Sequence, residues 1–182
     1  TAVDGLQLPD QKALAERLGP LLYDPVKGVR IEAARRLAGE PAKHLDADQK
    51  KVYQTVLREY ESAMAYSADF AFGRYNLGNL YTALNRTEEA IRNYRAAIKI
   101  DGLLPQPKVN LAMLYNRIGE NDKAEALFRD VITTHPDMHE IPYSLGLLLA
   151  EMKKYDQAVF YLEKAAKGLP ERARVHYNLG LL

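Results

Sequence analysis

Two histidines four positions apart are the first candidates for a functional site in this sequence. His135 and His139 have the spacing of metal ligands on one helix, and Glu140 follows the second. Pro136 and Asp137 stand between them and interrupt a continuous helix, which favours solvated histidines in a loop. The chain has no cysteine, which excludes thiolate metal sites, iron–sulfur clusters and covalent haem attachment in this segment. We therefore predict no metal site and no cofactor.

The sequence also lacks the residue patterns of catalysis. It contains no G-x-S-x-G nucleophile turn, no H-E-x-x-H zinc motif and no G-x-G-x-x-G dinucleotide motif. Gly73 and Gly78 have the separation seen in a phosphate-binding loop. However, Asn79 and Leu80 follow, where such a loop needs Lys and then Ser or Thr. We predict that the chain is not an enzyme.

Composition narrows the class of partner. Of the 182 residues, 47% are hydrophobic, which is enough to form a packed core. The 25 basic and 24 acidic side chains give a net charge of +1, so no charge excess points to nucleic acid. The longest apolar run, Leu145 to Ala150, is far shorter than the ~20 residues of a membrane span, and no signal peptide opens the chain. We expect no membrane insertion, and we interpret the sequence as a piece of a longer protein.

An internal repeat in the sequence predicts the helices on which any functional residue would lie. One block recurs with a period of about 34 residues, and its anchors are Leu77, Leu111, Leu145 and Leu179. The second half of each unit keeps the same period at three small residues, Ala90, Ala124 and Ala158. Apolar residues recur three and four positions apart within each unit, which is typical of helices. Because a helix pair with one apolar face cannot bury that face alone, successive pairs must stack.

The period predicts where the helices lie. We expect helix pairs near residues 71–84 and 88–100, 105–117 and 122–134, and 139–152 and 156–168, with a further helix from about 173 to 182. Thr87 and Asn121 have the side chains of helix N-caps. Small residues stand where two helices would cross closely: Gly78, Ala112, Gly146 and Gly180.

The pattern L-G-x-x-Y, then A-x-x-x-F, then P at this period resembles the tetratricopeptide repeat (TPR) family from about Ala71 to Leu182. Pro136 and Pro170 take the proline position. The resemblance implies three full repeats and the first helix of a fourth, in a superhelix whose first helices line a concave groove.

The segment before the repeats, residues 1–66, shows a related pattern. Leu21-Leu22-Tyr23-Asp24-Pro25, followed by Val29-Arg30, Ala33-Ala34 and Leu37, resembles one HEAT repeat. Its first helix would run from Gln11 to Leu18. Its second would be capped by Asp24, begin at Pro25 and end at Gly39.

A bridging helix follows the HEAT-like pair. Asp46 to Gln49 has the form of a capping box and opens a long helix to about Tyr66. The predicted fold is therefore all-α, an α-solenoid of stacked antiparallel helix pairs preceded by a HEAT-like pair. The domains are residues 1–66, for the HEAT-like pair and the bridging helix, and residues 67–182, for the TPR array.

The TPR resemblance implies that residues around each Leu-Gly anchor face the groove. The expected peptide-binding residues are Tyr75, Asn76, Asn79, Asn110, Met113, Arg117, Tyr143, Ser144, Leu147, Tyr177 and Asn178. Asn76, Asn110 and Asn178 form a ladder at the repeat period. Each amide offers a donor and an acceptor, which suits the backbone of an extended peptide. We predict a non-catalytic scaffold that binds a protein or an extended peptide.

One known groove chemistry is disfavoured. Chaperone-binding TPR domains are similar to one another in a clamp of Lys, Asn, Asn, Lys and Arg that holds a terminal carboxylate. Here Asn79 and Asn110 are kept, but Tyr75, Glu140 and Ser144 stand where basic residues are needed. The sequence therefore lacks the positive charge of a chaperone-tail adaptor.

The sequence leaves open two kinds of longer protein of which this chain would be a part. The HEAT-like unit running into TPRs resembles the C-terminal region of some bacterial multihaem c-type cytochromes. This chain would then be a docking arm of an exported, periplasmic protein; otherwise we expect a cytoplasmic one. The asparagine ladder also suggests the TPR arm of a peptide-modifying transferase. In either case, the last helix presents Leu179, Leu181 and Leu182 with little cover, and we expect self-association there.

Overall fold

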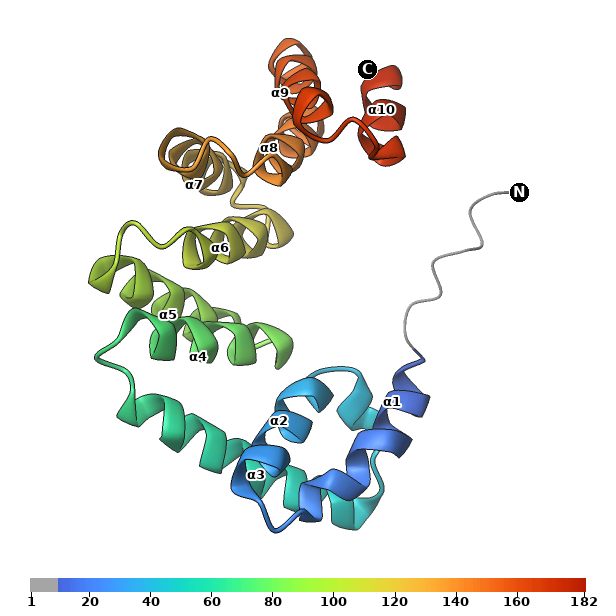
Figure 1. The fold of residues 1–182 in the computed structure, drawn as a ribbon, viewed down its shortest axis with the longest axis vertical. Coiled ribbons are helices and arrows are strands. Elements are labelled where there is room, and N and C mark those ends of the chain that lie inside the picture. The colour runs from blue at the N-terminus through green and yellow to red at the C-terminus, as the bar shows by residue number, and fades with distance from the viewer. Residues whose placement is uncertain (1–9) are drawn as a thin grey trace. The chain divides into compact units, whose positions relative to one another are not determined.

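The structure, a computed structural model, describes residues 10–182 and is helical throughout that part, without strands. The first nine residues of the predicted 1–66 segment lie outside the described residues. The chain divides into two compact units, residues 1–90 and residues 91–182 (Figure 1). We call them unit 1 and unit 2. The all-α prediction is confirmed.

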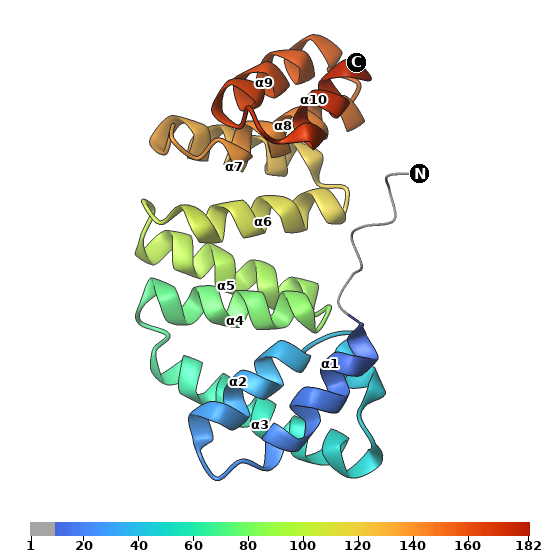
Figure 2. The same ribbon diagram turned by 45° about the vertical axis from the view of Figure 1, so that its right-hand side comes forward.

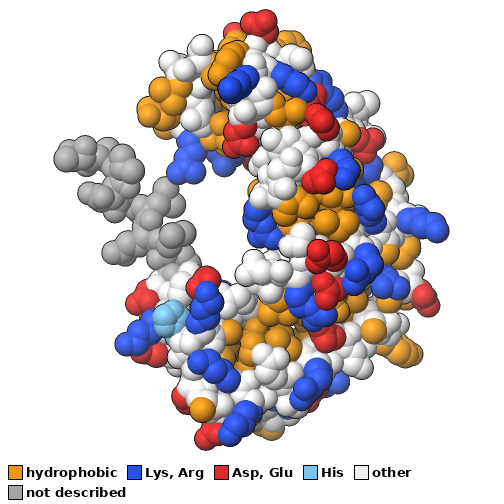
Figure 3. Space-filling view, turned by 180° about the vertical axis from the view of Figure 1, so that it is seen from behind, with side chains coloured by type: hydrophobic (Ala, Val, Ile, Leu, Met, Phe, Trp, Pro, Cys, Tyr) orange, Lys and Arg blue, Asp and Glu red, His pale blue; other side chains and the backbone are white. Residues whose placement is uncertain are grey.

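Unit 1 is built around the long helix α3. Its helices are α1 (Gln11–Leu18), α2 (Lys27–Leu37), α3 (Ala47–Tyr66), α4 (Ala71–Ala83) and the start of α5 (Thr87–Ile100). Two short 3₁₀ turns, η1 (Gly19–Tyr23) and η2 (Pro41–His44), link the first three helices, which gather as one group in Figure 2. Leu22, Ala34 and Leu37 are fully buried against Tyr53 and Val56 of α3. Figure 3 shows, in its lower part, that the surface of this unit mixes hydrophobic and charged side chains.

Local capping explains where the helices of unit 1 begin. The predicted capping box is confirmed: the Gln49 N–H donates to the Asp46 side chain at 2.8 Å, and the Gln49 side chain accepts from the Asp46 N–H at 3.1 Å. The predicted start of α2 at Pro25 is wrong by two residues. The Asp24 side chain accepts from the Val26 N–H at 2.8 Å, which forms a local turn, and helical structure begins only at Lys27.

Unit 2 is a run of antiparallel helices with short turns. They are α6 (Pro105–Arg117), α7 (Asn121–Thr134), α8 (Glu140–Glu151), α9 (Tyr155–Gly168) and α10 (Ala173–Gly180), after the rest of α5. These bounds confirm the helices expected from the repeat period to within a few residues. The predicted N-caps at Thr87 and Asn121 are wrong, because each is the first residue of its helix, α5 or α7, and Glu120 takes the cap position of α7 without a side-chain bond.

A backbone device ends the first helix of each repeat. Asn85, Gly119 and Lys153 lie one repeat period apart and share a positive φ, of 57°, 81° and 60°. In each case the next amide N–H reaches back five residues, as in the bond from Lys154 N to Leu149 O at 2.8 Å. The helix carbonyls are thereby satisfied by a left-handed C-terminal turn. This turn reverses the chain, so the second helix needs no side-chain cap to begin.

The core of unit 2 follows the repeat. Leu145, Leu149 and Leu162 are fully buried, together with the small residues Ala158 and Ala165. Burying a leucine side chain stabilises the folded state by about 1.5–3 kcal/mol. At Gly146 the helices approach closely, since a Cβ there would lie 2.7 Å from Leu162 Cγ. The predicted close crossing at this glycine is confirmed.

Candidate functional site

The first helices of unit 2, α6, α8 and α10, carry most of the predicted groove residues. Two side-chain hydrogen bonds join these helices. Asn116 Nδ2 donates to Glu151 at 2.9 Å and links α6 to α8. Asn178 Nδ2 donates to the Tyr143 hydroxyl at 2.7 Å and links α10 to α8. The three helices therefore present one connected surface.

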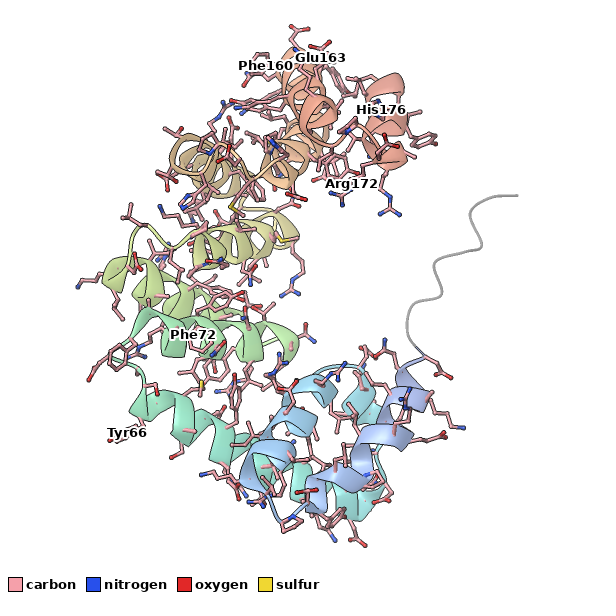
Figure 4. All side chains as sticks on the ribbon, in the orientation of Figure 1. Tyr66, Phe72, Phe160, Glu163, Arg172 and His176 are labelled. Carbon is pink, nitrogen blue, oxygen red and sulfur yellow. The ribbon has the colours of Figure 1, made fainter. Side chains whose placement is uncertain are left out.

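Tyr143 is a buried residue that supports this surface through its contacts with Asn178 and Arg172. Its side chain is only 7% exposed, and its hydroxyl accepts the bond from Asn178. The Arg172 guanidinium lies over its ring, with Cζ 5.1 Å from the ring centroid, and Figure 4 labels this arginine next to α10. Such a cation–π contact stabilises by about 0.5–1 kcal/mol at an exposed site. Tyr143 and Asn178 thus contact each other, whereas sequence reasoning treated them as separate ligand contacts.

Other members of the predicted set remain open to solvent. Met113 is 56% exposed on α6, and Tyr177 is 67% exposed on α10. Leu147 lies half-buried on α8, and Arg117 at the end of α6 is exposed. We call these four residues the first-helix face. It combines apolar contact area with one guanidinium, which suits a peptide side chain and its backbone carbonyls.

The remaining predicted residues of unit 2 are less available. The Ser144 hydroxyl donates to the Glu140 carbonyl oxygen within its own helix at 3.1 Å. Asn110 is half-buried on α6 and already takes part in an interaction.

The groove residues of unit 1 lie on α4. Tyr75, Asn76 and Asn79 are each half-buried. Asn76 Nδ2 lies 3.7 Å from the Met64 sulfur, a weak contact that ties α4 to α3. Since these residues belong to unit 1, the asparagine ladder across both units stays a prediction.

The two histidines flank the turn between α7 and α8. His135 is the C-cap of α7, and its Nδ1 lies 2.9 Å from the Thr134 hydroxyl. His139 is the N-cap of α8, and its ring packs so closely against Gly168 that no side chain fits there. Both histidine side chains therefore contact neighbouring residues of the fold. Within residues 10–182 no group of three His, Asp or Glu side chains could hold a metal ion.

An ion network ties α7 to α9 in unit 2. Glu125 accepts from Lys154 Nζ at 2.8 Å and pairs with Arg129 at 2.7 Å. Arg129 also donates to the Tyr161 hydroxyl at 2.7 Å and to Gln157 at 2.6 Å. Burial alone would raise the pKa of Glu125, but the hydrogen bonds from Lys154 and Arg129 outweigh burial and hold its pKa below the ordinary value. The network joins neighbouring repeats and is not arranged for proton transfer to a ligand.

Sequence reasoning missed Arg172, which covers Tyr143. It also missed the hydrogen bond between Asn116 and Glu151, which joins α6 to α8. The only available signal was their position at the ends of the first helices.

In the described part of the chain, no helix has the length and apolar character needed to cross a bilayer.

Comparisons with known proteins agree with this geometry. Two family models described as tetratricopeptide repeat match residues 71–102 and 109–169. The fold is similar to the crystal structure of MamA protein, at 20% identity over 92% of this chain and 96% of that chain, with a TM-score of 0.60. It is also similar to TTC0263, a thermophilic TPR protein in Thermus thermophilus, at 21% identity over 93% of this chain and 97% of that chain, with a TM-score of 0.59.

A third similar structure contains a ligand. The first TPR of Spaghetti (RPAP3), bound to the HSP90 peptide SRMEEVD, matches at 20% identity over 60% of this chain and 86% of that chain, with a TM-score of 0.57. At these identities the likeness shows the fold. A search of curated proteins found no match to this sequence.

Proposed function

This chain belongs to the tetratricopeptide repeat family, and we propose that it is a non-catalytic scaffold that binds an extended protein segment on the first-helix face. The observation that carries the proposal is the exposure of Met113 and Tyr177, at 56% and 67%, on helices joined to α8 by hydrogen bonds. Large apolar side chains held at the surface of a rigid support are typical of binding hot spots.

A TPR domain of similar fold binds a peptide, which supports the same use of this chain. The ligand itself must differ in chemistry. Ser144 and Glu140 stand on α8 where a carboxylate clamp would place basic residues, so a terminal carboxylate is not the expected anchor. We expect apolar side chains of the ligand to contact Met113, Leu147 and Tyr177.

The proposal is tested with peptides selected from a random twelve-residue display library on the whole chain. The affinity of a selected peptide is then measured for Tyr177→Ala and for Phe160→Ala. Phe160 is 60% exposed on α9, on the side away from α10 in Figure 4, so it is a matched aromatic control. We expect Tyr177→Ala to weaken binding about tenfold or more and Phe160→Ala to leave it unchanged. Equal effects of the two variants would contradict the proposal.

We also propose that α10 can associate with a second copy. Leu181 and Leu182 are 65% and 45% exposed beside Tyr177, and contiguous apolar surface favours association. Sedimentation across a concentration series should show a rising average mass for the natural sequence, and Leu181→Lys should suppress the rise. A natural chain that stays monomeric at all concentrations would contradict this.

A further inference from the structure

A groove in unit 1 runs along one side of α3. It consists of two adjoining hollows of about 500 Å³ and about 260 Å³, which share Gln54 and Leu84. Each volume is close to or within the ~300–1,000 Å³ of ligand sites. The rear view in Figure 3 shows hydrophobic surface between charged side chains in this part of the molecule.

The α3 wall of the groove is a single helical stripe. It is formed by six residues that follow one side of the helix: Lys50, Tyr53, Gln54, Leu57, Arg58 and Glu61. At 1.5 Å per residue, this stripe covers about 16 Å of helix. The opposite wall is the end of α4 and the turn after it, residues 83–86. The site is therefore long and narrow, with the length of a short extended peptide.

Backbone shapes one end of the groove. Gly39 has φ +96°, and a Cβ there would lie 2.9 Å from the Ala83 carbonyl oxygen. Only glycine lets the turn after α2 approach α4 so closely. Asn85, with φ 57°, turns the chain away from α4 beside it. This end of the groove is therefore formed largely by fixed backbone.

Both ends of the groove carry neutralised ion pairs. Lys43 pairs with Glu40 at 2.7 Å beside the Gly39 turn. At the other end, Arg86 pairs with Glu61 at 3.1 Å. Within each pair the opposite charges neutralise each other, so these four side chains add little net charge to the groove.

The α3 wall of the groove, in contrast, carries two positive side chains beside an apolar floor. Lys50 and Arg58 make no ion pair with any carboxylate of residues 10–182, and Arg58 donates only to the Thr55 hydroxyl at 3.3 Å. Between them lie the buried side chains of Tyr53 and Leu57. A ligand that fits this surface carries negative charge at two points and an apolar group between them.

The spacing of the two cations fits an extended chain. Lys50 and Arg58 are eight residues apart on α3, or about 12 Å along its axis. In an extended peptide, residues four apart lie about 13 Å from each other on the same face. The residue midway between them points to that face as well, level with Gln54 and between Tyr53 and Leu57.

We propose that this groove binds an extended segment of a partner protein in which two acidic residues stand four positions apart with an apolar residue midway. This goes beyond the scaffold function of the first-helix face, because it uses a different unit and different helices.

The test measures fluorescence anisotropy of a fluorescein-labelled peptide, Gly-Ser-Glu-Ser-Leu-Ser-Glu-Ser-Gly, titrated with the whole chain. We expect saturable binding that Lys50→Glu and Arg58→Glu each weaken about tenfold. The matched control is Lys51→Glu, which makes the same charge change on α3 outside the stripe, at a residue that forms an exposed ion pair with Asp48. We expect this control to bind within about twofold of the natural chain.

Two further peptides separate specific binding from general attraction. A rearranged peptide with adjacent acids, Gly-Ser-Glu-Glu-Leu-Ser-Ser-Ser-Gly, should bind about tenfold more weakly. The double variant Lys50→Glu with Arg58→Glu should instead gain affinity for Gly-Ser-Lys-Ser-Leu-Ser-Lys-Ser-Gly. Equal binding of the two acidic peptides, or equal losses in Lys51→Glu and Lys50→Glu, would overturn the proposal. So would a single-stranded oligonucleotide that binds more tightly than the acidic peptide and is lost in the same variants.

Discussion

The helices α8 and α10 carry the same block of sequence, Tyr-x-Leu-Gly-Leu-Leu, one repeat period apart. In α8 the block is covered by both α7 and α9, whereas α10 packs mainly on α9. Tyr143 is accordingly 7% exposed and Tyr177 is 67% exposed. The motif determines that a helix forms and which side is apolar, while the neighbouring helices determine whether that side becomes core or an open binding surface.

The largest difference is expected when the anchor leucines are shortened. Leu145→Ala removes a fully buried side chain, and we expect it to lower the free energy of unfolding by about 2–5 kcal/mol. Leu179→Ala, on the half-buried equivalent in α10, should cost about 1 kcal/mol. Urea denaturation of both variants measures this. Similar losses at the two positions would contradict the difference in cover.

Replacing the glycine of the block, Gly146 in α8 or Gly180 in α10, should also change stability differently. A Cβ at Gly146 would lie 2.7 Å from Leu162 Cγ and 3.3 Å from the Ala158 carbonyl oxygen, so Gly146→Ala should destabilise by about 1–3 kcal/mol. At Gly180 nothing lies within 4 Å, so Gly180→Ala should be neutral or slightly stabilising. Thermal unfolding of both variants gives the sign. Destabilisation by Gly180→Ala equal to that of Gly146→Ala would show that α10 is covered after all.

The tyrosine hydroxyls should differ by less. Tyr143→Phe removes the acceptor of the 2.7 Å bond from Asn178, and we expect a loss of about 1 kcal/mol in unfolding free energy. Tyr177→Phe, at the exposed equivalent, should change stability by less than about 0.5 kcal/mol. The two variants are compared in one urea series, and a double variant with Asn178→Ala checks the pairing. If Asn178→Ala and Tyr143→Phe add their full effects, the hydrogen bond does not couple them.

The smallest expected effect is the dependence of folding stability on pH. It comes from the ion network that joins α7 to α9, which has no counterpart on α10 among the described residues. The pKa of Glu125 is lowered in the folded state, so the carboxylate stabilises the fold above the ordinary glutamate pKa of about 4.3. That contribution is lost as the pH falls through the lower folded-state value. We expect Glu125→Gln to reduce stability at neutral pH by about 1 kcal/mol and to match the natural chain at strongly acidic pH.

The control for this prediction is Glu32→Gln in α2. The pKa of Glu32 is also lowered, by its hydrogen bond from Arg35, but that pair is exposed and lies within one helix. We expect a smaller stability change there. Urea midpoints measured between neutral and acidic pH test both variants. A pH dependence for Glu125→Gln that equals that of the natural chain would contradict the role of this carboxylate.

The sequence predicted the helices of the repeat well because their apolar spacing is local and repeats without a gap. It failed at Pro25, at Thr87 and at Asn121. There a local turn at Asp24 and left-handed turns at Asn85 and Gly119 determine where the next helix begins. That Tyr143 and Asn178 face a groove stays a prediction. The sequence could not predict that these two bond to each other, since that depends on how α10 sits against α8.

The most direct test of the scaffold function is a map of where a bound peptide lies. A photoreactive benzoylphenylalanine is placed at Met113 in one sample and at Phe160 in another, and each is illuminated with a selected peptide. Both positions are exposed and on different helices of unit 2, α6 and α9. We expect the peptide to crosslink from position 113 and not from position 160. Crosslinks from position 160 alone would contradict it.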